Sequence, residues 1–424
     1  MTDTTYEQIK TVTLKLLAYC QANNWAGYDP YDALNSKLLK YLPFLNFRLS
    51  RIALTQTLKR SPINFRPLLL IPRTENPKAI ALFLMAFLKL RRLGLLEDES
   101  LIPLMTEKLI GLRSPNNPSN PINLTNPSNP YWCWGYSFPW QTRTIVVPRG
   151  APNLVCTTFV ANALLDTYGS NHESRYLNMA IGAAEYIMNE LYWTEGDSIA
   201  SFSYPLPSLR SQTHNANFLG AALLCRVYKY CAEKKFLEPA LKVARYSASK
   251  QHNDGSWDYG ERVTQRWVDN FHTGFNLCAL RSICEDVGSS DFETHVRRGY
   301  EFYRRHFFRQ DGAPRYFHNR TYPIDIHCVA QTIITLLFLR ELDEGSTKLA
   351  QSVFEWAMTH MWDKQGYFHY QVIPFLKNRM SYMRWSQAWM LLSLSTLLEY
   401  RWETLVGTER CEIVKRSNMY EASA

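Results

Sequence analysis

One motif recurs along this 424-residue chain and constrains its fold more than any other feature. The segment QHNDGSWDYG (251–260) joins a sharp, glycine-containing turn to two aromatic residues. Related turns follow at RQDGAPRYFHN (309–319) and WDKQGYFHYQV (362–372), and earlier ones occur at YWCWGYSFPW (131–140) and WTEGDSIASFSY (193–204). Neighbouring turns start 53 to 62 residues apart, which is too long for ankyrin or tetratricopeptide units. We therefore expect a larger repeating unit.

Each turn is followed by two stretches of helical apolar periodicity. The first stretches start near 152, 211, 268, 323 and 381, and NPKAIALFLMAFLKLRRLG (76–94) reads as a further one. A second stretch, such as SRYLNMAIGAAEYIMNELYW (174–193), follows each, and TTYEQIKTVTLKLLAYCQ (4–21) can close the ring against the last helix. Helical hairpins that repeat and close bury one face of every helix without a sheet. The repeat predicts an all-α (α/α)6 toroid, with first helices inside and second helices outside.

Two segments fall outside the repeat, and neither has the character of a domain boundary. Residues 114–130 are rich in Asn and Pro and read as a loop insertion. Residues 408–424 have little apolar periodicity, so we expect a frayed tail. The sequence thus predicts one toroid domain over residues 1–424.

Composition narrows the class of protein and its partners. Apolar residues make up 46% of the chain and charged residues 20%, as in soluble globular proteins with a large core. No apolar run is long enough to span a membrane, and the N-terminus lacks a signal sequence, so we expect a cytoplasmic protein. The nine cysteines have no metal-ligand spacing, so neither a metal nor another cofactor is predicted. The net charge of +9 favours an anionic partner, but no nucleic-acid-binding motif accompanies it.

The turn motif also carries a family resemblance. Gln251, Gly255 and Trp257 match the QxxxGxW turn of terpene cyclases and related α/α-barrel proteins. The overall organisation is similar to six-hairpin carbohydrate-active enzymes, including unsaturated glucuronyl hydrolases and the helical domains of polysaccharide lyases. WAGYDPYD (25–32) and WCWGYSFPW (132–140) resemble segments of proteins from bacterial polysaccharide gene clusters. The chain lacks the DxDD acid of type II terpene cyclases and the DxC zinc element of prenyltransferases. An isoprenoid cyclase is therefore the third candidate function, after a carbohydrate-active enzyme and a glycan-binding protein. Trp257 reads as a packing residue.

Aligning the first helical stretches brings polar residues to equivalent positions at their starts. In a toroid these first turns face one funnel, and unpaired buried polar groups are costly, so we expect a site there. The candidate catalytic residues are His272, His327, Asp269 and Asp325. The candidate substrate-binding residues are Asn215, His214, Arg384, Gln387, Asn270, Trp134, Tyr136, Trp140, Tyr259, Tyr322 and Trp385. Asp269, Asn270 and Asp325 equally suit helix N-caps.

Two chemistries fit this set of residues. Glycoside hydrolysis uses two carboxylates, for which Asp269 and Asp325 are the candidates. Elimination or epimerisation of a uronic acid uses His272 and His327 to exchange a proton while Asn215 or Arg384 holds the carboxylate. We predict a protein of polysaccharide synthesis or modification that acts on an acidic oligo- or polysaccharide, with other proteins of polysaccharide biosynthesis as its partners. A glycan-binding or scaffold toroid without catalysis is the alternative.

Overall fold

Six inner helices form a closed ring. The computed structural model describes residues 4–42, 47–114 and 131–421, with Lys40 and 407–421 described by backbone alone. The ring consists of α3 (Pro77–Arg92), α5 (Leu154–Asn171), α7 (His214–Cys231), α9 (Asn270–Val287), α11 (Ile326–Phe338) and α13 (Ala388–Glu421). Each packs against the next, and α13 also packs against α3, which closes the ring. The predicted all-α (α/α)6 toroid is confirmed.

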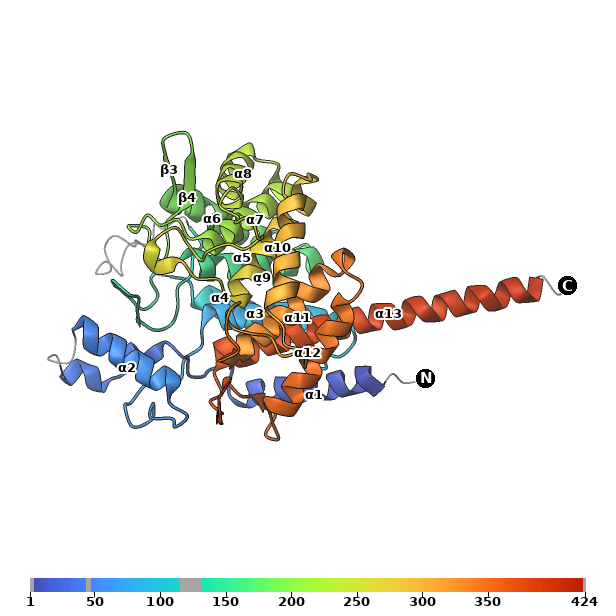
Figure 1. Ribbon diagram of the computed structural model, residues 1–424, viewed down its shortest axis with the longest axis horizontal. Coiled ribbons are helices and arrows are strands. Elements are labelled where there is room, and N and C mark those ends of the chain that lie inside the picture. The colour runs from blue at the N-terminus through green and yellow to red at the C-terminus, as the bar shows by residue number, and fades with distance from the viewer. Residues whose placement is uncertain (1–3, 43–46, 115–130, 422–424) are drawn as a thin grey trace.

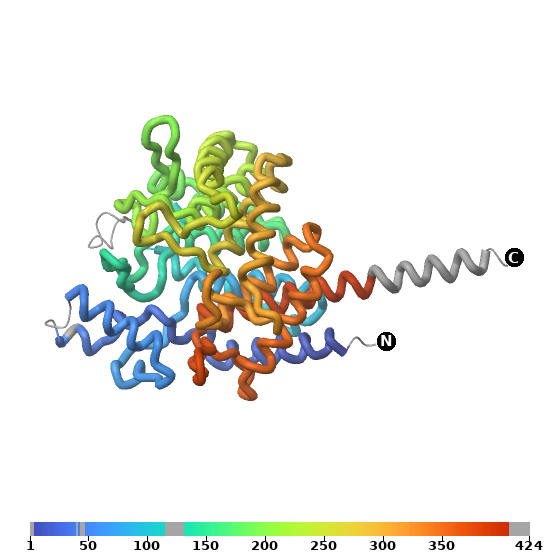
Figure 2. The backbone as a smooth tube through the Cα atoms, in the orientation of Figure 1, coloured from blue at the N-terminus to red at the C-terminus, as the bar shows by residue number. Residues whose placement is uncertain are grey.

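A second layer of helices surrounds the ring. It consists of α1 (Thr4–Ala22), α4 (Leu101–Gly111), α6 (Ser174–Tyr186), α8 (Lys234–Ala248), α10 (Glu293–His306) and α12 (Ser346–His360). The outer helices α4, α6, α8, α10 and α12 each pack on the inner helix that precedes them in the chain, whereas α1 packs on α13. Figure 2 shows the blue α1 beside the red start of α13. The N-terminal segment therefore packs against the last inner helix, as predicted, and completes the outer layer.

The two layers differ in the pattern of their apolar residues. Helix α3 buries twelve of its sixteen residues, because it contacts helices on several sides. Helix α10 buries one stripe, made by Val296, Gly299, Tyr300, Phe302 and Tyr303. A helix buried on most of its surface belongs to the interior, while a single stripe marks a helix with a solvated outer face.

The recurring turn is mainly structural. Gly255 has φ +93°, and a Cβ there would lie 2.3 Å from the carbonyl oxygen of Arg298 on α10, so only glycine fits. Trp257 is buried, donates its indole N–H to the carbonyl of Ser247 at 3.1 Å, and packs edge-on against Phe218. The packing role predicted for Trp257 is confirmed.

Short antiparallel hairpins decorate the connections between helices. The strands are β1 (Trp140–Gln141), β2 (Val146–Val147), β3 (Tyr192–Glu195), β4 (Ile199–Phe202), β5 (Ile324–Asp325), β6 (Trp362–Asp363), β7 (Tyr367–Phe368), β8 (Gln371–Ile373) and β9 (Leu376–Asn378). They pair as β1–β2, β3–β4, β6–β7 and the three-stranded β5–β8–β9. The β5–β8 register places Asp325 opposite Gln371 at the start of α11.

The connection between α1 and α3 contains an element that the repeat did not predict. It includes α2 (Arg48–Arg60), which lies apart from the helical hairpins at one end of the molecule (Figure 1). A buried ion pair within this connection joins Arg66 Nε to Asp32 Oδ1 at 2.8 Å. A second one, Arg384 Nε to Asp29 Oδ2 at 2.6 Å, attaches the connection to the ring.

Two expectations from the sequence fall outside the described parts. Nearly all of the Asn/Pro-rich insertion at 114–130 lies beyond the described residues. The tail expected to fray at 408–424 lies where no side chain is described. Among the helices that are described, none has the length and apolarity needed to cross a membrane.

Candidate functional site

The start of α9 holds a carboxylate–imidazole pair. Asp269 caps the helix, accepting a hydrogen bond from the His272 backbone N–H at 3.0 Å through Oδ1. Its Oδ2 lies 2.7 Å from His272 Nδ1 and accepts a second bond from Trp267 Nε1 at 3.0 Å. An ionised carboxylate only accepts, so the proton of the neutral imidazole is on Nδ1 and the lone pair on Nε2. The cap predicted for Asp269 is confirmed, and the carboxylate also orients His272.

His272 is partly exposed at the start of α9. Its side chain is 21% exposed, and Nε2 has no hydrogen-bond partner among the described residues. The ring of Tyr259 lies 4.6 Å from the imidazole and stacks on Trp267 at 4.6 Å with an interplanar angle of 11°. An oriented neutral imidazole with a free Nε2 is the arrangement that a general base requires.

A set of tyrosines gathers near the start of α9, one from each connection that leads to an inner helix, close enough to influence one another electrostatically. They are Tyr31, Tyr136, Tyr204, Tyr259, Tyr316 and Tyr370, named here the tyrosine ring. Burial raises the pKa of Tyr136 well above 10, and the neighbouring Tyr204 raises it further. The pKa of Tyr259 is raised in the same way, by burial and then by Tyr204. These hydroxyls therefore lie close enough to influence one another and stay protonated, as donors and acceptors for a sugar.

Backbone hydrogen bonds place three of these tyrosines in register. The first N–H of α7, from His214, donates to the carbonyl of Tyr259 at 3.1 Å. The first N–H of α9 donates to Tyr316 at 2.9 Å, and that of α11 to Tyr370 at 3.1 Å. These three inner helices each use an otherwise unpaired N-terminal N–H to fix the tyrosine of the next connection.

His327 occupies the start of the neighbouring helix but is closed off. It is 1% exposed, and neither ring nitrogen has a hydrogen-bond partner among the described residues. The rings of Phe271, Trp385 and Trp389 lie 4.5 to 4.7 Å from its own. Burial, helped by the nearby cation of Lys78, holds the pKa of His327 well below 6.5. His327 is therefore a neutral imidazole within an aromatic cluster.

Asp325 is also closed off. It is fully buried and caps α11, accepting at Oδ1 from the backbone N–H of His327 at 2.8 Å and from Trp385 Nε1 at 2.9 Å. Its Oδ2 accepts from Gln371 Nε2 at 2.6 Å. Burial raises the pKa of Asp325 to about 6 despite these three donors. The predicted cap is confirmed, and no oxygen of Asp325 is left for a ligand.

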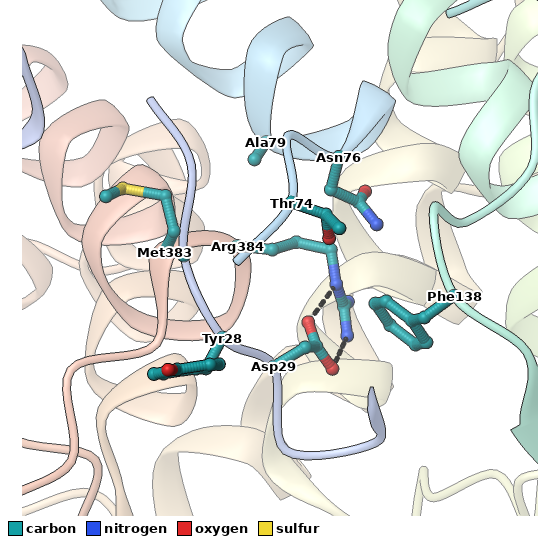
Figure 3. A pocket seen from close by; sticks show the side chains of 9 residues that line it. Tyr28, Asp29, Thr74, Asn76, Ala79, Phe138, Met383 and Arg384 are labelled. Atoms are coloured by element: carbon teal, nitrogen blue, oxygen red, sulfur yellow. Dashed lines mark hydrogen bonds and ion pairs between the residues drawn. The ribbon is translucent and has the colours of Figure 1, made fainter. Parts of the chain in front are cut away.

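Arg384 lies in a π-helical turn, Met383–Gln387, and is already paired. Its guanidinium donates to both oxygens of Asp29, at 2.6 and 2.8 Å (Figure 3). It also lies over the ring of Tyr136, 4.8 Å from the ring centroid. The cavity beside this pair has a volume of about 10 Å³, room for roughly one water molecule. The charge of Arg384 is neutralised within the protein, so Arg384 is not free to bind a substrate carboxylate.

Several other predicted residues serve the framework. His214 Nε2 lies 2.9 Å from Glu261 and its Nδ1 3.2 Å from Ser247. Asn270 is the first residue of α9 rather than its cap, and its Oδ1 accepts from Tyr303 and Thr332. The Gln387 side-chain amide accepts a hydrogen bond from the backbone N–H of Phe368 and donates one to its carbonyl.

The remaining candidates lie in three different surroundings. Trp134 is fully buried and donates to the carbonyl of Leu109, while Tyr322 is 37% exposed. Trp140 is half-buried, with its indole N–H unpartnered among described residues. Asn215, at the start of α7, is 3% exposed and its Oδ1 likewise lacks a partner.

The sequence did not predict four members of the tyrosine ring, namely Tyr31, Tyr204, Tyr316 and Tyr370. It also did not predict two charged residues near Arg384: its ion-pair partner Asp29 and the buried Lys78. In three units the tyrosine precedes the last residue before the inner helix by nine or ten positions, as for Tyr204, Tyr259 and Tyr316. That spacing was a usable signal. Asp29 and Lys78 gave none: Asp29 is 355 residues from Arg384, and Lys78 resembles any lysine near a helix start. Burial, together with the charge of Arg384, lowers the pKa of Lys78 well below 10.5.

The described residues include no metal-binding cluster. Nowhere among them do three His, Cys, Asp or Glu side chains gather closely enough to hold a metal ion.

Comparisons with known proteins bear on the fold. No described protein family and no curated protein matches the sequence. Among solved structures, a cellobiose 2-epimerase from Bacillus thermoamylovorans matches with a TM-score of 0.58 and 11% identity, over 78% of this chain and 90% of that one. An unsaturated glucuronyl hydrolase specific for heparin matches at 0.56 and 12%, over 94% and 97%. A polysaccharide lyase matches at 0.53 and 10%, over 93% and 98%.

These three structures share the six-hairpin toroid, as the sequence resemblance predicted. Their names describe an epimerase, a hydrolase and a lyase, so one fold supports three reaction types. At 10 to 12% identity the likeness establishes the fold alone. The chemistry of this chain has to be argued from its own side chains.

Proposed function

We propose that this chain is a carbohydrate-active enzyme that abstracts a proton from a sugar bound within the tyrosine ring, in an epimerase- or lyase-type reaction. The observation that supports it is the Asp269–His272 pair, with a 2.7 Å contact at Nδ1 and an unpartnered Nε2 on a partly exposed ring. Asp269 holds the imidazole in the tautomer that accepts a proton at Nε2 and stabilises the imidazolium that forms.

Hydrolysis by two carboxylates has less support. Such hydrolysis needs one carboxyl group to protonate the leaving oxygen and another to act from across the bond. The Asp269 side chain is 1% exposed and bonded to His272, Trp267 and the helix N-terminus. Asp325 is fully buried with three donors. Neither carboxylate has an oxygen directed to a ligand.

Proton return requires a second group, which we assign to the tyrosine ring. His327 is on the adjacent helix but is enclosed by Phe271 and Trp385. Tyr259 and Tyr316 are half-buried, and their hydroxyls have no protein partner among the described residues. Because burial keeps both phenols protonated, either one can donate to the carbon or the leaving oxygen.

The acidic group of the proposed substrate is assigned to Arg143 rather than to Arg384. Arg384 is buried and neutralised by Asp29. The exposed Arg143 lies 5.4 Å from the ring of Trp267, which stacks on Tyr259. We propose that a sugar ring occupies the tyrosine ring while an acidic group of the same oligosaccharide meets Arg143. A role in polysaccharide synthesis or modification and a cytoplasmic location remain predictions from the sequence.

The test is hydrogen exchange and product analysis in heavy water. Wild-type protein is incubated with reducing disaccharides and uronate-containing oligosaccharides, and proton NMR follows exchange at the carbon next to the carbonyl or carboxyl group. Epimerisation incorporates deuterium, and elimination yields an unsaturated sugar that absorbs in the ultraviolet. His272→Ala should lower the rate by ~10²–10⁴-fold, the usual contribution of a general base. His252→Ala, at an exposed histidine of a turn, is the matched control.

The outcomes separate the alternatives. If the His272→Ala variant incorporates deuterium at the wild-type rate, His272 is not the general base. Hydrolysis without exchange, lost on Asp269→Asn and Asp325→Asn alike, would reassign the reaction to the carboxylates. Binding without any turnover would leave a glycan-binding toroid.

A further inference from the structure

The connection between α1 and α3 carries a surface of unusual composition. Residues 33–74, named here the 33–74 segment, contain eight Lys and Arg and no Asp or Glu. Its own buried cluster is small, consisting of Ala33, Leu58 and Ile71. Most of the large apolar side chains described in this segment lie outside that cluster.

These side chains face solvent. Six of them keep more than half of their surface exposed: Tyr41 81%, Phe47 54%, Leu49 70%, Ile63 61%, Leu68 73% and Leu70 51%. Elsewhere in the described chain, only Val263 and Phe375 among the large apolar side chains do so. This concentration of exposed apolar side chains in one connection favours a site of interaction.

A second segment, distant in sequence, extends the same surface. Asn378, on the hairpin of β8 and β9, donates through Nδ2 to the carbonyl of Ser61 at 3.0 Å. The tip of this hairpin carries Phe375, which is fully exposed, followed by Lys377 and Arg379. No acidic residue occurs between 364 and 398. The combined surface is thus apolar and basic, without acidic residues in either segment.

The surface is held rigidly on the toroid. Arg66, buried within the 33–74 segment, pairs with Asp32 and donates to the carbonyl of Asp29 at 2.9 Å. Asp29 in turn pairs with Arg384 of the ring, and Arg51 Nε donates to Gln141 at 2.7 Å. These buried bonds fix the backbone, so the apolar side chains cannot fold back onto the core without breaking them.

We infer that this surface docks on a membrane that carries anionic lipids. Exposed aliphatic and aromatic side chains enter the boundary between headgroups and acyl chains, and flanking Lys and Arg bind lipid phosphates. A second copy of the chain is a poorer occupant, because two basic surfaces would repel each other. The described helices include none able to span a bilayer, so the contact is peripheral. This inference does not depend on the proposed reaction.

Vesicle co-sedimentation tests it. Wild-type protein should bind vesicles of phosphatidylcholine mixed with phosphatidylglycerol, and bind pure phosphatidylcholine far less. Lys37→Gln with Arg60→Gln, two exposed cations with no side-chain partner in the described structure, should weaken binding by roughly tenfold or more. Raising the salt concentration should weaken binding by the wild-type protein. Lys234→Gln with Lys242→Gln, two exposed cations on outer helix α8, is the matched control and should bind like wild type.

A second pair of changes isolates the apolar contribution. Leu49→Ser with Leu68→Ser should reduce binding to the mixed vesicles while the thermal unfolding midpoint and monomeric state stay unchanged. Leu104→Ser on α4, also at an exposed leucine, is its control. Failure of the wild-type protein to prefer anionic vesicles would overturn the inference. So would a wild-type dimer that Leu49→Ser with Leu68→Ser converts to monomer, because the surface would then be a self-interface.

Discussion

The starts of α9 and α11 contain the same residue types, but the histidine of α9 is partly exposed whereas the histidine of α11 is buried. Each has an aspartate cap followed by a histidine in the first turn. In α9 the histidine follows the cap by three residues, and His272 turns Nδ1 back onto Asp269 with Nε2 in the open. In α11 it follows by two, and His327 points among aromatic rings without any partner.

One residue of spacing accounts for this difference. Successive positions on a helix are separated by 100°, so a shift by one moves a side chain to another face. The His272 ring stays above its own cap, whereas the His327 ring turns inward and leaves the second oxygen of Asp325 to Gln371. Reactivity in this fold therefore depends on register against the cap as well as on residue type.

The largest expected difference between the two caps is in turnover. Asp269→Asn retains a capping oxygen but replaces the acceptor of the Nδ1 proton, which favours the wrong tautomer of His272. The rate of deuterium incorporation should fall by ~10²–10⁴-fold. Asp325→Asn should leave the rate close to wild type, because Asp325 has no oxygen open to a ligand. Equal losses in the two variants would show that the two caps do not differ in role.

The next effect is on stability and concerns Asp325. Its pKa is raised from an ordinary 3.8 to about 6, so between these values the folded protein holds a proton that the unfolded chain releases. This contribution to stability is fully present below pH ~4 and is lost as the pH rises through about 6, to a limit of about 3 kcal/mol. Asp325→Asn should abolish that loss in urea unfolding followed from pH 4 to 7. An unchanged pH profile would contradict the shift.

His327 has the opposite sign and a smaller effect over the same range. Its pKa is depressed in the folded protein, so the unfolded chain gains a proton below 6.5 that the folded protein does not. The stability present above 6.5 is lost as the pH falls, by about 1.4 kcal/mol at pH 5.5. His327→Leu should remove this acid sensitivity in urea unfolding followed over the same pH range. In wild type the two residues offset each other, so each single variant should expose the other's pH dependence.

Much of the fold was predictable, because its signal repeats. The turn built on Gly255 recurs with glycines at 312 and 366, all with positive φ, and each precedes an inner helix. Six similar units average out local ambiguity. The 33–74 segment occurs once, and its attachment through Asp29 and Arg384 joins residues 355 positions apart. A pattern read along the chain contains no information about such a pair.

The candidate site was predictable in place but not in detail. Aligning helix starts correctly directed attention to Asp269 and His272, which the structure brings into contact. The same alignment treated His327 as equivalent to His272, since composition does not reveal a one-residue change of register. It also treated Arg384 as free, because its partner comes from the connection before α3. Neutralisation by a distant carboxylate is a property of the assembled fold.

The smallest expected effect distinguishes two tyrosines of the ring by their hydroxyls. Tyr204 is half-buried with no protein partner for its hydroxyl among the described residues, whereas the Tyr370 hydroxyl is buried and equally unpartnered. A hydrogen bond to a sugar contributes about 0.5–1.5 kcal/mol, so Tyr204→Phe should weaken oligosaccharide affinity by ~2–12-fold without loss of stability. Tyr370→Phe removes a buried group that lacks a partner, so stability should hold or rise while affinity stays constant. Calorimetric titration and thermal unfolding of both variants measure the two effects. If Tyr370→Phe alone weakened affinity, the sugar would reach deeper than the open tyrosines, and the floor beside His327 would have to be part of the site.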